Sequence, residues 1–161
     1  MKNIYLNLYK PSSINLKKAK INIENNKVIG LPTETVYGLA ANAYSDKSVN
    51  KIYSLKKRPF INPLIIHFYN LKQLQKDVVL NKTFIKLHKA LCPGPITFIL
   101  YRKPKSRISN KATGGKKTIA IRFPKHPVAR KLLKKLEFPL AAPSANISSK
   151  LSPTSAHDVI D

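Results

Sequence analysis

The sequence predicts an α/β fold in which helices flank a twisted sheet of mixed parallel and antiparallel strands. Short apolar runs typical of buried strands alternate along the chain with segments that have helical periodicity. Prolines stand at several boundaries between these segments, where they end or introduce an element. The 161 residues are 43% hydrophobic, which suffices for one domain with a core. We therefore expect a single domain over residues 1–161.

The expected strands are short apolar segments set off by breaks. The run Lys27–Leu31 is typical of a buried strand, and Pro32 ends it because proline has no N–H for a neighbouring strand. Pro63 introduces a second buried strand over 64–68. The remaining strands are expected at 3–9 on an edge, 96–101, 118–123 and 140–142.

The expected helices begin at capping residues. Ser12 or Ser13 caps a helix over 14–25, and Asp46 caps a helix over 47–57, which Pro59 terminates. Further helices are expected at 71–76, 84–91 and 127–136, and one begins near residue 154. The inward apolar positions of the first two helices are Ile14, Ala19, Ile21 and Ile23, then Val49, Ile52, Tyr53 and Leu55.

The charge is extreme, with 30 Lys and Arg against 7 Asp and Glu, or +23. Such a balance favours polyanions such as nucleic acid. The chain is also rich in Lys, Asn and Ile together, which is the trio that an AT-rich genome encodes, so both explanations stay open. The run 102–117 is expected to be a mobile basic loop, either solvated or in contact with RNA.

Several classes of protein are disfavoured. No apolar run could span a bilayer and no signal-peptide pattern is present, so we expect a cytoplasmic protein without a membrane partner. Cys92 is the single cysteine, which excludes a disulfide framework. The four histidines are scattered without ligand spacing, so no protein-held metal site is expected.

Polar residues gather at the ends of the predicted strands, most densely after Leu31. They supply cations, hydroxyls and an amide but almost no carboxylates, with Glu34 the only central candidate. No Ser-His-Asp order and no glycine-rich phosphate loop is present. This set suits an anionic substrate whose reaction needs alignment and charge neutralisation, as in phosphoryl or nucleotidyl transfer. Taken singly, most of these residues are more often found in turn, packing or helix-end roles, and only the full set of motifs favours a site.

Six motifs in order resemble those of the YrdC-type threonylcarbamoyl-AMP synthases, from about residue 12 to the end. They are Pro32-Thr33-Glu34-Thr35-Val36-Tyr37-Gly38-Leu39, Lys56-x-Arg58-Pro59, Asn62-Pro63-Leu64 with His67, Pro93-Gly94-Pro95-x-Thr97, Ile121-Arg122-x-Pro124 and Pro143-Ser144-Ala145-Asn146. The resemblance implies a basic concave cleft and a reaction in which L-threonine, bicarbonate or CO2, and ATP give threonylcarbamoyl-AMP and pyrophosphate. It also implies a partner complex that transfers the group to an adenosine of tRNA.

The resemblance assigns two sets of residues. The threonine site is expected to hold Thr35, His67, Arg122 and the backbone at Ala142. The ATP site is expected to hold Lys56, Arg58, Asn62, Thr118, Ser144, Asn146 and Ser152. Lys56 and Arg58 are the expected catalytic residues, because they can offset charge on the departing pyrophosphate. Mg²⁺ is expected to accompany the triphosphate rather than protein ligands.

The chain departs from this family at its end. The family continues past the last helix with a Ser or Thr and an arginine that close over the substrate, so we expect a truncated chain with poor turnover. A non-catalytic RNA-binding module, contacting tRNA or double-stranded RNA, is the alternative that the charge favours. A carbamoyl-transfer domain of the hydrogenase-maturation type is a third interpretation, and it would need carbamoyl phosphate instead of threonine.

Overall fold

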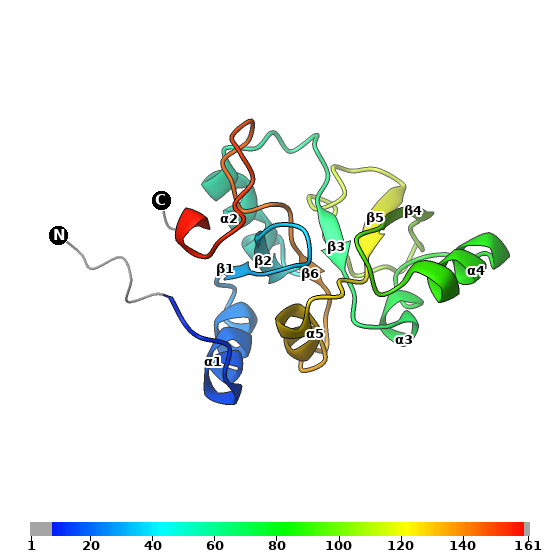
Figure 1. Ribbon diagram of the computed structural model, residues 1–161. Helices are drawn as coiled ribbons and strands as arrows, with labels where there is room; N and C mark the ends of the chain where they lie inside the picture. The colour runs from blue at the N-terminus through cyan, green and yellow to red at the C-terminus, as the bar shows by residue number, and fades with distance from the viewer. Residues whose placement is uncertain (1–7, 160–161) are drawn as a thin grey trace.

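A six-stranded mixed sheet forms the centre of the computed structural model, which describes residues 8–159 (Figure 1). Its strand order is β1-β2-β6-β3-β5-β4. The strands are β1 (Ile29–Leu31), β2 (Gly38–Asn42), β3 (Ile65–His67), β4 (Thr97–Tyr101), β5 (Thr118–Arg122) and β6 (Leu140–Ala141). Only β3 and β5 pair in parallel, which confirms the mixed sheet. The edge strand expected at 3–9 falls mostly outside the described residues, and residues 8 and 9 are not in a strand.

Helices flank this sheet close to the expected positions. They are α1 (Ser13–Glu24), α2 (Asp46–Lys56), α3 (Leu71–Leu74), α4 (Lys82–Leu91), α5 (Pro127–Leu133) and a 3-10 turn, η2 (His157–Val159). Ser12 caps α1 by accepting a hydrogen bond from the Asn15 amide. The expected cap at Asp46 is wrong, because Ser45 is the extended residue whose side chain accepts from the Ser48 amide.

The strand β2 is the main element that the sequence did not predict. Its Gly-Leu-Ala-Ala-Asn sequence has little β propensity, yet Ala40 and Ala41 are fully buried between neighbouring elements. A Cβ on Gly38 would lie 3.3 Å from the carbonyl oxygen of Pro143, so only glycine fits there comfortably. The small residues thus allow β1 and β6 to pack closely on both sides of β2.

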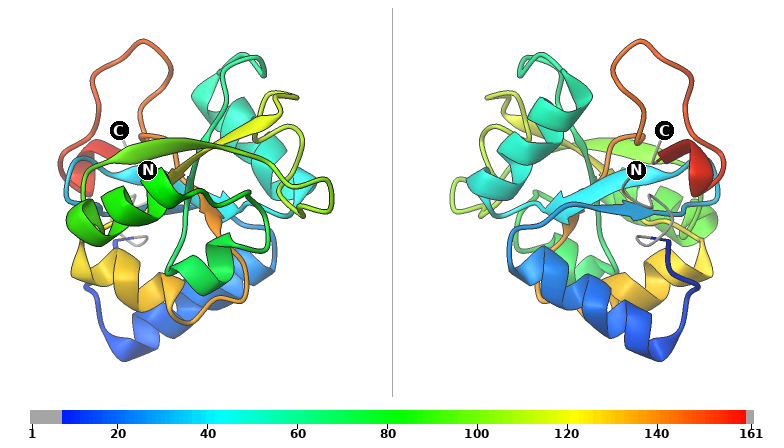
Figure 2. Two further views of the ribbon diagram at one scale, coloured as in Figure 1. Left: turned by 90° about the vertical axis from the view of Figure 1, so that its right-hand side faces the viewer. Right: turned by 90° about the vertical axis from the view of Figure 1, so that its left-hand side faces the viewer.

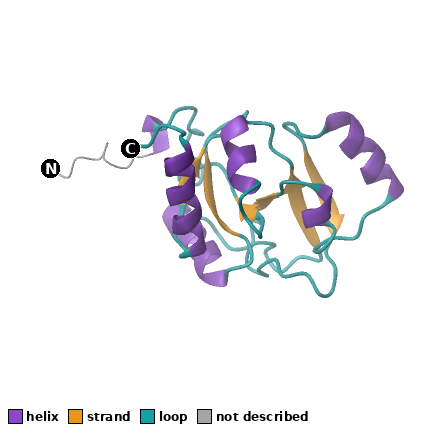
Figure 3. Cartoon of the chain, turned by 90° about the horizontal axis from the view of Figure 1, so that it is seen from below, coloured by secondary structure: helices purple, strands orange, loops and turns teal. Residues whose placement is uncertain are grey.

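Two apolar cores lie on opposite faces of the sheet. One contains Ile52 of α2, Phe84 of α4 and the β-strand residues Ile66 and Ile121. In the other core, α1 and α5 lie side by side beneath β1, β2 and β6 (Figure 2 and Figure 3). Its buried side chains include Leu16, Ile23, Leu132, Leu133 and Leu140.

Three of the expected inward positions are wrong. Ile14 and Ile21 of α1 are 71% and 46% exposed, because Leu16 and Ile23 define the buried face of that helix. Leu55 of α2 is 58% exposed, since it lies outside the stripe formed by Val49, Ile52 and Tyr53. The helical periodicity of the apolar residues therefore predicted the helices correctly, but it did not predict which face of each helix is buried.

The second face of the sheet is open over β3, β5 and β4. Strand pairing places His67, Arg122 and Thr97 side by side, and Ile65, Ala120 and Ile99 side by side in the next row. Ile99 and Tyr101 on this face are 72% and 69% exposed, so no element between residues 8 and 159 covers them. We call this surface the open face.

The basic run 102–117 is anchored, in contrast to the mobile loop that its composition predicts. Ile108 is 1% exposed and packs into the first core. The buried carboxylate of Asp77 accepts hydrogen bonds from the Ser106 hydroxyl and the Arg107 amide, at 2.8 and 2.9 Å. Ser109 also donates to the carboxylate of Asp46. The chain's few acidic side chains thus fix this loop to the body of the protein.

Candidate active site

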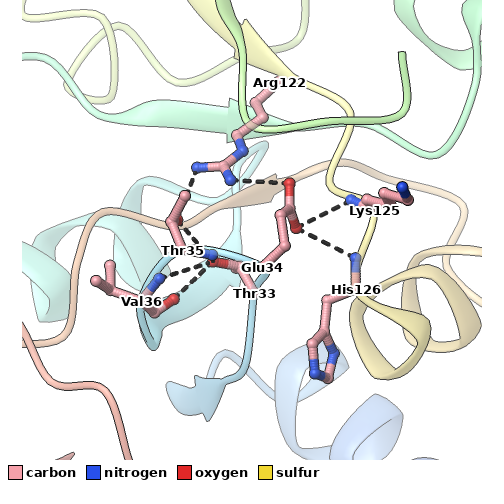
Figure 4. Close-up of polar contacts among 7 residues, drawn as sticks. All are labelled: Thr33, Glu34, Thr35, Val36, Arg122, Lys125 and His126. Atoms are coloured by element: carbon pink, nitrogen blue, oxygen red, sulfur yellow. Dashed lines mark hydrogen bonds and ion pairs between the residues drawn. The ribbon is translucent and has the colours of Figure 1, made fainter. Parts of the chain in front are cut away.

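Arg122, at the end of β5, organises one end of the open face. Its Nη2 donates to Glu34 Oε1 at 2.8 Å, and its Nη1 donates to Thr35 Oγ1 at 3.1 Å (Figure 4). Both partners come from the loop 32–37, which follows β1 and folds back over the sheet. Glu34 and Thr35, which are adjacent in the sequence, therefore hold the guanidinium group in one orientation. Thr35 lies 87 residues before Arg122 along the chain.

The loop 32–37 is shaped by its own polar side chains. The Thr33 hydroxyl donates to the Val36 carbonyl at 2.6 Å and accepts from the Val36 amide at 3.3 Å, closing a tight turn (Figure 4). The Tyr37 amide donates to the Pro153 carbonyl at 2.9 Å, and the Ala145 amide donates to the Tyr37 carbonyl. Thr33 is thus a turn residue, whereas Thr35 is free to face Arg122.

His67 lies beside Arg122 because the two residues pair across β3 and β5. Burial lowers the pKa of His67 to about 4, and the positive charge of Arg122 acts in the same direction. The imidazole is therefore neutral at pH 7. Its Nδ1 and the Nε of Arg122 are buried without a hydrogen-bond partner among residues 8–159. Unpartnered buried nitrogens are uncommon, so these two set this end apart from an ordinary sheet edge.

The opposite end of the open face is built around Lys56, the last residue of α2. Its Nζ donates to the carbonyl oxygen of Ser144 at 2.5 Å and to that of Asn146. Burial lowers the pKa of Lys56 to about 8, and the neighbouring Arg58 contributes. The side chain is 2% exposed, so its ammonium fixes the 143–146 loop against α2.

Arg58 lies on the loop between α2 and β3. Its Nε donates to the Asn62 carbonyl and its Nη2 to the Pro63 carbonyl, both at 3.1 Å. Lys57 adopts a left-handed conformation with φ of 49°, which ends α2 and turns the chain toward this loop. Arg58 is half-buried and Asn62 is exposed, so this end is more open to solvent than the end at Arg122.

Strand direction separates the two ends. Thr118 begins β5 and Arg122 ends it, so four residues of extended chain place them roughly 13 Å apart. Ser144 follows β6, which runs antiparallel to β3, and therefore lies near the beginning of β3 with Pro63 and Thr118. We call these regions the carboxylate end, at Arg122, and the phosphate end, at Thr118.

The remaining expected site residues occupy less decisive positions. The amide of Ala142 donates to the Ile65 carbonyl at 2.9 Å, so the sheet already uses that donor. The side-chain amide of Asn146 donates to the carbonyls of Ile147 and Lys150, which stabilises its own loop. Ser152 is exposed farther along the same loop. Their contacts with a ligand stay predictions.

Glu34 is the site residue to which sequence reasoning gave no role. The motif contains it, but nothing in the sequence shows that it reaches Arg122, 88 residues later. Within residues 8–159, no group of three His, Cys, Asp or Glu side chains is placed to hold a metal ion. No helix in that range is long and apolar enough to cross a membrane.

A family model described as telomere recombination, and named for Sua5, YciO and YrdC, matches residues 22–161. A threonylcarbamoyl-AMP synthase of Pyrococcus abyssi is 47% identical over 86% of this chain and 41% of its own length. A putative threonylcarbamoyl-AMP synthase of Methanocaldococcus jannaschii is 34% identical over 99% of this chain and 75% of its own length.

The fold also matches a solved structure, that of P. abyssi Sua5 complexed with L-threonine. The TM-score is 0.88 at 41% identity, and the match covers 94% of this chain and 44% of that chain. This chain therefore spans about two fifths of the length of its P. abyssi relative. The expectation that further residues close over the substrate stays a prediction.

Proposed function

This chain belongs to the Sua5/YciO/YrdC family, and on that premise we propose that it forms threonylcarbamoyl-AMP from L-threonine, bicarbonate or CO2, and ATP. The observation that supports this most directly is that the sequence motifs gather in two groups, one at each end of β3 and β5. Arg122, His67 and Thr35 gather at the carboxylate end, whereas Arg58, Thr118 and Ser144 lie toward the phosphate end. A product that joins an amino acid to a nucleotide needs two such ends.

Threonine enters the carboxylate end in this proposal. The guanidinium of Arg122 donates to its carboxylate, since charge-assisted hydrogen bonds from arginine to a carboxylate are strong. The neutral His67 next to it offers a ring nitrogen for a hydroxyl or amine of the substrate. The P. abyssi Sua5 structure is a complex with L-threonine, which favours the same occupant here.

The chemistry needs no nucleophilic side chain. Bound threonine first gives a proton of its ammonium group to water. The neutral amine then forms a bond to the carbon of CO2 as one C=O π bond opens, and a second proton passes to water to leave a carbamate. A carbamate oxygen then attacks the α-phosphorus of ATP, and the bond between that phosphorus and the bridging oxygen breaks as pyrophosphate leaves. Arg58 is the cation we assign to the departing charge, because it lies at the phosphate end and is only half-buried.

Lys56 has an indirect part in this scheme. Because its ammonium binds the carbonyls of Ser144 and Asn146, it orders the loop that carries two of the expected ATP contacts. Mg²⁺ belongs to the proposal as an ion that neutralises the triphosphate. The phosphate end offers cations, hydroxyls and amides instead of paired carboxylates, so the ion would rest on phosphate oxygens and water.

The motif resemblance to the YrdC-type synthases also implies a step after threonylcarbamoyl-AMP is formed. A partner enzyme would consume threonylcarbamoyl-AMP by transferring its acyl group to tRNA. The excess of 30 basic over 7 acidic residues is compatible with RNA contact. A module that only binds RNA would show salt-sensitive RNA affinity without affinity for threonine or ATP, which distinguishes it from the synthase.

The test is pyrophosphate release from ATP by the purified chain, with and without L-threonine and bicarbonate. We expect release to require both, and we expect Arg58→Ala and Ser144→Ala to reduce it at least about tenfold, or about 1.4 kcal/mol in the barrier. Replacing threonine and bicarbonate by carbamoyl phosphate tests the hydrogenase-maturation alternative. The proposal would be refuted if pyrophosphate release did not depend on threonine. It would also be refuted if both variants released pyrophosphate as fast as the unmodified chain.

A further inference from the structure

Glu34 accepts three hydrogen bonds at the carboxylate end, although the proposed reaction gives it no role. Its Oε1 accepts from Arg122 at 2.8 Å, and its Oε2 accepts from the amides of Lys125 and His126 at 3.0 and 3.1 Å (Figure 4). Burial raises the pKa of Glu34, but the hydrogen bonds from Arg122 and the backbone outweigh it, and the pKa falls below its usual value. The carboxylate is therefore ionised at neutral pH.

The ion pair leaves the carboxylate end without net charge. The side chains of Arg122 and Glu34 are only 10% and 18% exposed, so water screens them weakly. A guanidinium alone would attract any carboxylate. With Glu34 paired to it, a ligand that brings only a carboxylate adds an uncompensated negative charge to a largely buried site, which is costly.

A zwitterionic amino acid avoids this cost because it carries both charges. Its carboxylate can lie against the guanidinium of Arg122, which shares the open face with His67 and Thr97. Its ammonium can donate to Oε1 of Glu34, which accepts one hydrogen bond, whereas Oε2 accepts two. The ion pair of Arg122 and Glu34 thus offers one charge of each sign, and the zwitterionic amino acid carries the two complementary charges.

We propose that Glu34 is a specificity-determining residue, which makes the carboxylate end select zwitterionic amino acids over carboxylic acids that lack the amine. The inference rests on the proposed function, since it takes Arg122 as the group that binds the substrate carboxylate. A rival role is purely structural, in which Glu34 only ties the loop 32–37 to α5. That role would weaken every ligand of this end by the same factor.

The test compares two ligands by titration calorimetry at pH 7. L-threonine carries both charges, and 3-hydroxybutanoate is the same molecule with hydrogen in place of the amine. The proteins are the unmodified chain, Glu34→Gln and the control Glu137→Gln, which removes an exposed carboxylate outside the site. The readout is the ratio of the two affinities, because a structural role does not change it.

We expect the unmodified chain and Glu137→Gln to prefer threonine by at least about tenfold. We expect Glu34→Gln to reduce that preference at least about fivefold, through weaker threonine binding and stronger binding of 3-hydroxybutanoate. Glu34→Asp, which retains the charge, should keep more of the preference than Glu34→Gln.

An unchanged ratio in Glu34→Gln would overturn the inference even if both affinities fell. Equal affinity of the unmodified chain for the two ligands would also overturn it, and that measurement needs no variant that might be unstable. A chain that binds 3-hydroxybutanoate but not threonine would do the same. A chain that binds neither ligand would refute the proposed function itself, together with everything inferred from it.

Discussion

The two ends of the open face are built by different means. At the carboxylate end, Arg122 is buried and bound by the side chains of Glu34 and Thr35. At the phosphate end, Arg58 is half-buried and donates to the main-chain carbonyls of Asn62 and Pro63. One arginine is therefore part of a buried charge pair, whereas the other is a loop residue supported by its own loop.

This difference separates stability from binding. A buried ion pair cannot lose one member cheaply, because the charge that remains is left without compensation. A half-buried arginine on backbone carbonyls can be removed with little effect on folding, since water replaces it. Substitutions of Arg122 should thus affect folding and binding together, whereas substitutions of Arg58 should affect binding more than folding.

The largest expected effect is a difference in the free energy of unfolding between two single variants, each of which lacks one of the two arginines. Arg122→Met should lower the free energy of unfolding by about 3 kcal/mol, because it leaves the partly buried carboxylate of Glu34 without its ion-pair partner. Arg58→Met should lower it by less than about 1 kcal/mol. Urea unfolding monitored by circular dichroism measures both values. If the two variants lost the same free energy of unfolding, the two ends would not differ in their contribution to stability.

The next effect is a pH dependence that belongs to His67. Its folded pKa of about 4 lies below the usual value of 6.5, so the unfolded chain binds more protons between these values. The free energy of unfolding should therefore rise as the pH increases from 4 to 6.5 and level off above that. His67→Gln should flatten this rise by about 2 kcal/mol relative to the unmodified chain.

The control for this comparison is Gln75→Ala, which removes an exposed side chain that carries no titratable group. It should leave the slope between pH 4 and 6.5 close to that of the unmodified chain. A slope that His67→Gln leaves intact would mean that the histidine at the carboxylate end is not buried in its neutral form.

A smaller effect is expected from Lys56, which sharpens the account of the phosphate end. Lys56→Met removes the hydrogen bonds to the carbonyls of Ser144 and Asn146 while keeping most of the side-chain volume. The KM for ATP should rise about tenfold, with the KM for threonine changed less than about twofold. Lys47→Met, at an exposed position of the same helix, is the matched control. A rise confined to the threonine KM would contradict the loop-ordering role.

The smallest expected effect is at Thr118. Thr118→Val keeps the shape of the side chain but removes its hydroxyl from the phosphate end of β5. The KM for ATP should rise about threefold to fivefold, as expected for one hydrogen bond to a ligand. Steady-state kinetics at saturating threonine measures this change. An unchanged KM would remove Thr118 from the set that contacts ATP.

The sequence predicted elements better than it predicted their contacts. Five strands and most helices were expected at nearly their observed positions, because apolar runs and capping residues are local signals. The strand β2 was missed, since its alanines and glycine become strand-like only through packing against β1 and β6. The exposure of Ile14 and Leu55 likewise depends on tertiary packing.

The site shows the same division. Motifs placed Thr35, His67 and Arg122 in one set, and the structure brings these three residues together. The contacts of Glu34 and of Lys56 span 88 or more residues and no local pattern contains them. Both side chains bind other parts of the protein, so a motif that indicates a ligand site cannot show which of its charges already have partners.

The most direct test of the two-ended site is a crossed binding measurement. Calorimetric affinities for L-threonine and for ATP with Mg²⁺ are determined for the unmodified chain, Arg122→Lys and Arg58→Lys, which keep the charge and remove the planar fork. The account predicts that Arg122→Lys weakens threonine at least about tenfold more than ATP, and that Arg58→Lys does the reverse. Loss of both ligands to the same extent in each variant would contradict it.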